Sequence, residues 1–193
     1  MSSNDMAAMA KDIDFLKSEL DKLKSLQEIR DLKYRYYHII DHFLYDSMGE
    51  VFTEDASATM GPYGLIEGRE SLDKFFNEEV YPNFDMILHG AHNPQIVLTS
   101  ESTARGTWMY EVFQMTSEST PTGVWLCGLY RDEYVRVDGQ WKIKYLEGSY
   151  YFNTNGETPW LRDRYSAYPP GAPGLPREFR LMKGDDPKLP GWP

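Results

Sequence analysis

Apolar residues recur at helical spacing near the start of the chain. Steps of three and four residues alternate along one stripe, which consists of Ile13, Leu16, Leu20 and Leu23. This spacing predicts an amphipathic helix whose charged residues lie off the stripe. We expect this apolar stripe to be buried against another surface, either of another subunit or of the chain's own domain.

The pattern changes after Leu23. From Leu23 to Leu32 the apolar residues follow at steps of three, so the stripe drifts around a straight helix by about 60° per step. Ser25 and Glu28 have the spacing of a capping box, which is typical of helix starts. We therefore predict that a helical arm, residues 1–24, precedes a second helix that packs in the core.

Turn signals and a further helical pattern occupy the middle of the chain. Residues 49–58 predict a helix end and a turn that lead into a strand, and the sequence Gly-Pro-Tyr-Gly at 61–64 predicts another turn. A helix is predicted at 68–81. Its apolar face consists of Leu72, Phe75, Phe76 and Val80.

Strand patterns dominate from residue 87 onward. Strands are predicted at 93–99, 104–116, 124–137 and 140–153, and Gly90 and Pro94 mark a loop that enters the first of them. Asp138-Gly139, between the last two strands, is a strong hairpin signal, and Gly128 indicates a bulge that bends the sheet. Helices followed by long antiparallel strands predict an α+β domain in which helices pack on one face of a curved antiparallel sheet.

The strand at 104–116 alternates between apolar and polar residues. Trp108 and Tyr110 fall on the apolar face, which is predicted to point inward. Either residue could form a wall of a binding pocket or part of an ordinary core. Residues 158–193 hold most of the prolines, so we predict an extended tail with aromatic anchors after one domain at 25–157.

Composition narrows the classes of partner. The net charge of −10 repels phosphate backbones and anionic lipids, so we expect neither nucleic acid nor a membrane as a partner. Cys127 is the single cysteine and no apolar run is long enough to span a bilayer, which indicates a reduced, cytoplasmic protein. Aromatic residues make up 15% of the chain, a composition that suits a pocket for a flat, apolar ligand.

The segment from Tyr36 to His42 places two histidines and an aspartate on an apolar helix. Asp41 among apolar neighbours fits a pocket acid or base, although a carboxylate at a helix end can simply hydrogen bond to a turn. Tyr37 and Asp41 share a helix face, since they lie four residues apart. His38 and His42 have the spacing of half a metal site, but no third ligand lies at a diagnostic spacing, so we predict no metal.

Five segments resemble, in family order, the SnoaL-like branch of the nuclear transport factor 2-like superfamily, whose fold is an α+β cone. They are residues 32–43, 51–56, 89–98, 103–111 and 130–143. Bile acid 7α-dehydratase-type and cofactorless diaryl lyase-type members are the most similar. The tail from residue 158 onward is outside this resemblance.

The resemblance implies a set of site residues. Asp41 and His92 match an aspartate–histidine dyad across the cone mouth, with His89 as a weaker candidate for the histidine, and Tyr36 matches a tyrosine that lines the pocket. Tyr63 matches a second tyrosine, and Tyr150 stands where the dehydratases have an arginine. The predicted catalytic residues are thus Asp41, His92 and Tyr36, and the predicted substrate-binding residues are Tyr63, Trp108, Tyr110 and Tyr150.

The resemblance also implies a function. We expect a cofactor-independent lyase that acts on a hydrophobic, multi-ring substrate, either a steroid or a lignin-derived diaryl compound. The reaction would lose water, or cleave a C–C bond and release formaldehyde. An isomerase and a non-catalytic binding or assembly module of the same fold are the alternatives. A homo-oligomer, a trimer or a dimer, is expected as well.

Overall fold

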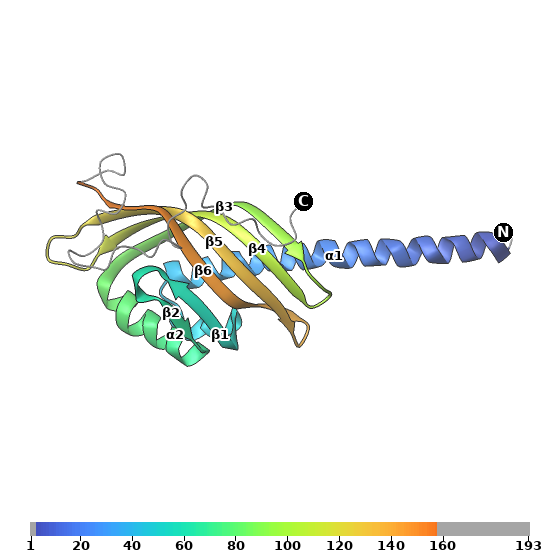
Figure 1. Cartoon of the computed structure of the whole chain (residues 1–193), viewed down its shortest axis with the longest axis horizontal. Helices are drawn as coiled ribbons and strands as arrows, with labels where there is room; N and C mark the ends of the chain where they lie inside the picture. The colour runs from blue at the N-terminus through green and yellow to red at the C-terminus, as the bar shows by residue number, and fades with distance from the viewer. Residues whose placement is uncertain (1–2, 158–193) are drawn as a thin grey trace.

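A curved sheet of six strands and one long helix form the frame of the molecule (Figure 1). The computed structural model describes residues 3–157. The elements follow in this order: α1 (Ser3–Asp41), η1 (Tyr45–Glu50), β1 (Phe52–Met60), η2 (Gly61–Tyr63), β2 (Leu65–Glu67), α2 (Arg69–Phe75), η3 (Phe76–Val80), η4 (Tyr81–Asn83), β3 (Phe84–Leu98), β4 (Thr103–Thr116), β5 (Gly123–Val137) and β6 (Gln140–Asn155). The α+β fold predicted from the sequence is confirmed, and the helix predicted at 68–81 corresponds to α2 and η3.

Helix α1 is continuous, so the predicted start of a second helix at Ser25 is wrong. The Ser25 hydroxyl donates to the carbonyl oxygen of Asp21 at 2.8 Å, as serines inside helices do. Glu28 pairs with Arg136 at 2.9 Å instead of capping the helix. Both residues of the apparent capping box are therefore used in other contacts, and the helix runs through them.

The strands are arranged in the order β2-β1-β6-β5-β4-β3, and the sheet is not closed. Neighbouring strands are antiparallel except for β1 and β6, which are parallel. The predicted hairpin between β5 and β6 is confirmed, since Asp138 and Gly139 have φ angles of 49° and 79°. The predicted bulge is confirmed as well, because the pairing of β5 with β6 shifts register between Cys127 and Gly128.

Strand β3 is longer than the sequence indicates. It begins at Phe84, whereas the sequence predicts a strand that starts at residue 93 after a loop. Pro94 is tolerated because β3 is an edge strand, where a missing N–H group breaks no ladder. Asn93 has a φ of 48°, and the register shifts between His92 and Gln95, so a bulge replaces the expected loop.

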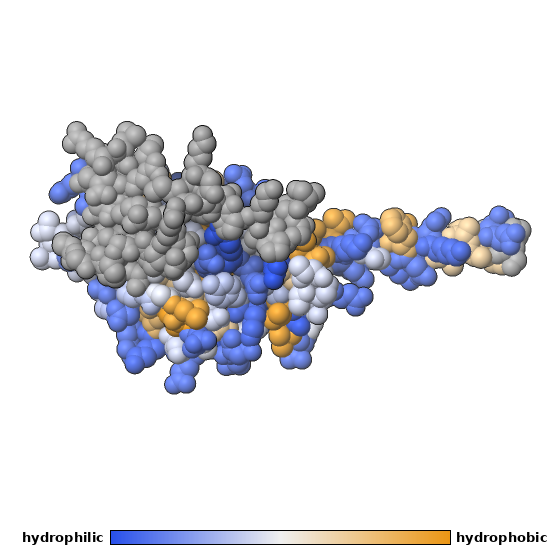
Figure 2. All heavy atoms as spheres, in the orientation of Figure 1, coloured by the Kyte–Doolittle hydropathy of each residue, from blue (hydrophilic) through white to orange (hydrophobic). Residues whose placement is uncertain are grey.

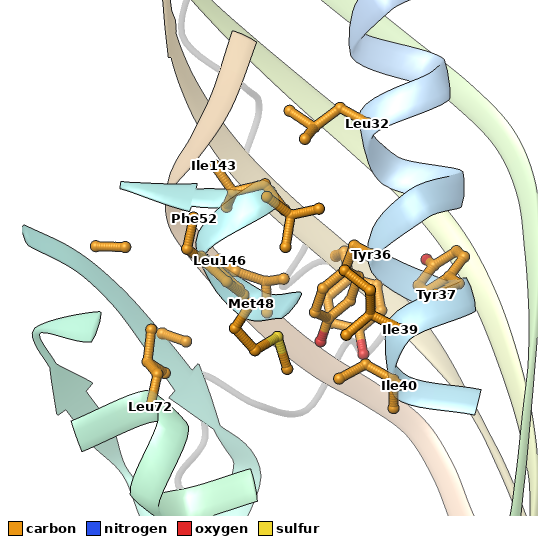
Figure 3. Packing of buried hydrophobic residues seen from close by; sticks show 14 of the residues in the cluster. Leu32, Tyr36, Tyr37, Ile39, Ile40, Met48, Phe52, Leu72, Ile143 and Leu146 are labelled. Carbon is orange, nitrogen blue, oxygen red and sulfur yellow. The ribbon is translucent and has the colours of Figure 1, made fainter. Parts of the chain in front are cut away.

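The apolar core lies between the second half of α1 and the sheet (Figure 3). Ile29 and Ile39 of α1 are fully buried, as are Ile143 and Leu146 of β6. Met48 of η1 is fully buried in the same cluster. This packing holds the end of α1 against the sheet, where the candidate site forms.

The first half of α1 makes no such contacts. Residues 4–24 are exposed apart from Glu19, which is half-buried, and full burial begins at Ser25. The predicted tail at 158–193 lies outside the described residues. Within residues 3–157, no helix is long and apolar enough to cross a membrane.

Candidate active site

Asp41 is the last residue of α1, and the way the helix ends determines where its carboxylate lies. Phe43 has a left-handed φ of 55°. The N–H of Phe43 donates to the carbonyl oxygen of Ile40 at 3.1 Å, and the N–H of Leu44 donates to that of Ile39 at 2.9 Å. These two bonds form a Schellman motif, which ends the helix at Asp41. The helix therefore stops where its last side chain reaches β3.

The Asp41 carboxylate makes two hydrogen bonds to His89 of β3. Oδ1 accepts from Nδ1 at 2.6 Å, and Oδ2 accepts from the backbone N–H at 3.0 Å. Both side chains are largely buried, with exposed fractions of 7% for His89 and 11% for Asp41. An ionised carboxylate only accepts hydrogen bonds, so this contact places a proton on Nδ1, and in the neutral ring Nε2 then keeps its lone pair. No residue within 3–157 donates to this Nε2.

His92, the predicted partner of Asp41, lies on the other face of the strand. Its Nε2 is 3.4 Å from Oε1 of Glu111, and 44% of its side chain is exposed. Successive side chains of a strand point to opposite faces, so His92, three residues after His89, points away from the core. The predicted pairing of Asp41 with His92 is wrong, and His89 takes that place.

Tyr37 lies one helical turn before Asp41, and its ring stacks on His89. The ring centroids are 4.9 Å apart and the planes are inclined by 11°. The Tyr37 hydroxyl is buried and has no hydrogen-bond partner among the described residues, and the same holds for Tyr45. Burial raises the pKa of both hydroxyls, and the Asp41 carboxylate raises that of Tyr45 further. Both groups are therefore neutral hydrogen-bond donors.

Further tyrosines continue from the dyad of Asp41 and His89 along the inside of the sheet. Tyr37 contacts Tyr130 at a centroid distance of 6.1 Å, Tyr130 stacks on Tyr110 at 4.0 Å, and Tyr110 meets Tyr150 edge-on at 6.5 Å. Burial raises the pKa of Tyr150 to about 12, so its hydroxyl is neutral as well. We call these five residues the aromatic row: His89, Tyr37, Tyr130, Tyr110 and Tyr150.

A buried ion pair lies beneath the aromatic row. Lys33, four residues before Tyr37 on α1, donates to Oδ2 of Asp132 at 2.8 Å, and both side chains are fully buried. Tyr134 donates to the same oxygen at 2.6 Å. The Lys33 ammonium also lies 4.0 Å from the ring centroid of Tyr130. Burial lowers the pKa of Lys33 and raises that of Asp132, while the charge of each partner opposes the shift of the other.

Comparison with known proteins gives these residues a family context. The SnoaL-like domain family matches residues 21–147, well over half of the chain. The chain belongs to this family. Hexachlorocyclohexane dehydrochlorinase 1 of Sphingobium indicum is 26% identical over 156 residues, a match that covers 80% of this SnoaL-like chain and 96% of the relative.

Crystal structures of related proteins agree with the fold of this SnoaL-like protein. A hexachlorocyclohexane dehydrochlorinase, LinA type 2, matches with a TM-score of 0.67 at 23% identity, over 79% of this chain and 99% of the other. A scytalone dehydratase-like protein of Novosphingobium aromaticivorans matches with a TM-score of 0.65 at 25% identity, over 69% of this chain and 89% of the other. The predicted family is thereby confirmed, whereas the bile acid 7α-dehydratase subtype stays a prediction.

Tyr36, the third predicted catalytic residue of this SnoaL-like protein, lies in the apolar core. Tyr36 is buried, contacts Phe52 edge-on at 5.7 Å, and leaves α1 in a different direction from Tyr37 (Figure 3). Tyr37, which was not predicted as a site residue, is the one that stacks on His89. The helical spacing to Asp41 was the signal that could have identified it. A catalytic role of Tyr36 stays a prediction.

The predicted substrate-binding residues are spread along the sheet and its rim. The inward direction of Trp108 and Tyr110 is confirmed, since both are buried. The Trp108 indole N–H donates to the Tyr134 hydroxyl at 2.8 Å, which ties it to the buried ion pair. Tyr63 is 56% exposed and packs edge-on against Phe75 at 5.0 Å. The binding roles of these residues and of Tyr150 stay predictions.

The histidine pair at 38 and 42 lies outside the dyad. The two rings are 4.1 Å apart, and Nδ1 of His42 donates to the backbone carbonyl of His38 at 2.9 Å. Among the residues that the structure describes, no group of three or more His, Cys, Asp or Glu side chains could hold a metal ion.

Proposed function

We propose that this protein is a cofactor-independent lyase in which His89 moves a proton and Asp41 positions His89. The observation that carries this proposal is the double contact of the Asp41 carboxylate with the ring and the backbone of His89. Such a contact fixes both the orientation and the tautomer of the imidazole.

The chemistry follows from the free Nε2 atom. In a dehydration, Nε2 takes a proton from a substrate carbon, the C–H electron pair forms the new double bond, and the C–O bond to the leaving hydroxyl breaks. The imidazolium then returns the proton to the departing oxygen, and water is released. Asp41 stabilises the imidazolium between the two steps, so no external electron acceptor is needed.

C–C cleavage uses the same groups. Nε2 would take the proton of a substrate hydroxymethyl group, the C–C bond would break, and formaldehyde would leave. For the electron pair to have an acceptor, a phenolic substrate first loses its benzylic hydroxyl and its phenol proton as water, which gives a quinone methide. The electron pair released by the C–C cleavage enters this quinone methide and restores the phenolate, which takes the proton back from the imidazolium. In either reaction, the neutral hydroxyls of Tyr37 and Tyr45 can donate hydrogen bonds to a leaving or developing oxygen anion.

The aromatic row supports a hydrophobic, ring-containing substrate. Its rings stack on His89 and on one another, so the surroundings of the dyad are apolar and aromatic, an environment that suits a ring-containing ligand. The elimination named for the Sphingobium relative, a dehydrochlorination, and the dehydration named for the Novosphingobium protein support a lyase. As substrate classes we propose hydroxylated steroids and lignin-derived diaryl diols.

Mass spectrometry of the purified protein with a panel of these compounds tests the proposal. We expect a product lighter by water, or by water and formaldehyde together. His89→Gln and Asp41→Asn should each reduce turnover by roughly two to four orders of magnitude, the range for loss of a general base or its positioning partner.

His92→Gln is the matched control, because this histidine lies on the same strand but faces away from the core. It should retain wild-type turnover. Equal losses in the His89 and His92 variants would contradict the assignment of the base. Binding of panel compounds without any turnover would favour a non-catalytic binding module instead.

A further inference from the structure

The first half of α1 extends beyond the sheet as a helical arm (Figure 1). Six of its apolar side chains have exposed fractions between 47% and 64%. These residues are Met6, Met9, Ile13, Leu16, Leu20 and Leu23. Figure 2 shows hydrophobic residues between charged ones along this arm. An exposed apolar stripe of this length indicates an interaction surface.

The stripe has the spacing of a coiled coil. Steps of three and four residues alternate without a break from Met6 to Leu23. Counted as heptads, Met6, Ile13 and Leu20 occupy the a positions, and Met9, Leu16 and Leu23 occupy the d positions. We call these six residues the seam. A repeat of 3.5 residues that holds over three heptads favours a partner helix wound around the arm with a left-handed supercoil.

Among residues 3–157, nothing of the same chain covers the seam, whose side chains stay exposed. A groove of about 920 Å³ separates the arm from the turn between β3 and β4, and the arm lines it with polar residues such as Asp14, Ser18 and Asp21. Leu32, which packs on the sheet, lies nine residues after Leu23 and so about half a turn away from it around the helix. The drift in the apolar pattern thus marks a change from one helix face to another. A partner on the seam leaves the packing of α1 on its own sheet intact.

The charged residues beside the seam favour a second copy of this chain as the partner, with its helix parallel to the first. Asp12 and Glu19 occupy g positions, and Lys17 and Lys24 occupy e positions. In a parallel pair of identical helices, each g residue faces the e residue five positions later on the partner. Asp12 of each chain would face Lys17 of the other chain, and Glu19 of each chain would face Lys24 of the other. In an antiparallel pair the g residues would face each other, which places like charges together.

We propose that two copies of this chain associate through a parallel, in-register coiled coil of their arms. Ile13, which is β-branched, lies at an a position, while leucines occupy two of the three d positions, a distribution that favours two strands. The side of the arm that points away from the partner helix is the side that, further along α1, packs on the sheet. Each chain therefore keeps a complete domain, and the two domains follow the coiled coil at the same end.

Sedimentation analysis of the full chain at micromolar concentration tests the association. We expect a dimer for the wild type and a monomer for the double variant Leu16→Glu/Leu20→Glu. Phe15→Glu is the matched control, because Phe15 is as exposed as Leu16 but lies at an outer c position. This variant should remain a dimer. A monomeric wild type, an assembly of three chains, or an oligomer that survives the double variant would each overturn the proposal.

Cysteine cross-linking tests the direction of the helices. A Leu16→Cys variant places two thiols next to each other only when the arms are parallel and in register, and we expect a covalent dimer under oxidising conditions. Phe15→Cys should not form one. The native Cys127 is buried in β5 and does not interfere. A monomer in both variants, while sedimentation shows a dimer, would rule out the parallel register.

Discussion

Replacement of Lys33 by methionine tests how the interior of the cone is held together. Lys33 and Asp132 form a buried ion pair, and neither side chain is exposed to solvent. Methionine keeps the unbranched apolar stem of lysine but removes its charge. The Asp132 carboxylate would then retain only the hydrogen bond from Tyr134. Its Oδ1 atom already has no partner among the described residues.

The expected cost is large because a charge is left buried alone. Breaking a buried pair by removal of one partner typically costs about 3–5 kcal/mol. For a protein of this size each kcal/mol lowers Tm by roughly 2–4 °C, so Lys33→Met should lower Tm by roughly 6–20 °C. The double variant Lys33→Met/Asp132→Asn should cost only about 1–2 kcal/mol, because the amide oxygen still accepts from Tyr134 and no charge remains.

The penalty should also depend on pH. Burial raises the pKa of Asp132, and removal of the Lys33 ammonium removes the main opposing charge. The folded variant therefore favours the protonated carboxyl. Its stability relative to the wild type should recover below about pH 4, near the pKa of an unfolded aspartate, and should fall as the pH rises through that value.

Urea unfolding followed by tryptophan fluorescence and circular dichroism measures all three proteins. Coincident transitions from the two probes justify the comparison of free energies. Additive costs of the two substitutions, or a cost of Lys33→Met below about 1 kcal/mol, would refute the reasoning, since a buried pair requires strong coupling between its partners.

Two other substitutions separate packing from function. Gly128→Ala should destabilise the fold by about 1–3 kcal/mol, because the new methyl group would collide with the backbone carbonyl of Ser149. An unchanged midpoint of urea unfolding would contradict this prediction. Tyr37→Phe should leave stability unchanged or raise it by up to about 1 kcal/mol, because it removes a buried hydroxyl without a partner among the described residues. The same variant should lower kcat/KM at least tenfold if that hydroxyl binds the substrate oxygen, and full activity would exclude this role.

The strands with strict alternation were predictable, whereas elements shaped by distant contacts were not. Strands β4, β5 and β6 follow the apolar pattern of the sequence closely. The apparent capping box at Ser25 has the correct spacing, but Arg136 of β5 binds both Ser25 and Glu28. A tertiary contact from more than 100 residues away thus overrides a local signal.

The choice of histidine shows a second limit. Gly90 and Pro94 indicate a loop, and a loop gives no information about which side chains point inward. Once β3 is recognised as an edge strand that tolerates Pro94, alternation alone assigns His89 to the inner face and His92 to the outer one. The sequence therefore held the signal, but only together with the sheet order.

Lys33 shows a third limit. Its spacing of four and eight residues from Tyr37 and Asp41 places it on the inner face of α1, where a lysine is unexpected. Its partner Asp132 lies 99 residues later on β5. Nothing in the local sequence marks the two as a pair, because buried charges are recognised by their partners and those partners meet only in the fold.

The tautomer of His89 tests the central claim most directly. Long-range nitrogen–proton correlation spectra distinguish the two ring nitrogens, and the chain has only four histidines, so the His89→Gln variant identifies the signal. We predict a proton on Nδ1 and an unprotonated Nε2 in the neutral ring, with this preference lost in Asp41→Asn. A neutral ring protonated on Nε2 in the wild type would contradict the account, because the proposed base would then have no lone pair to use.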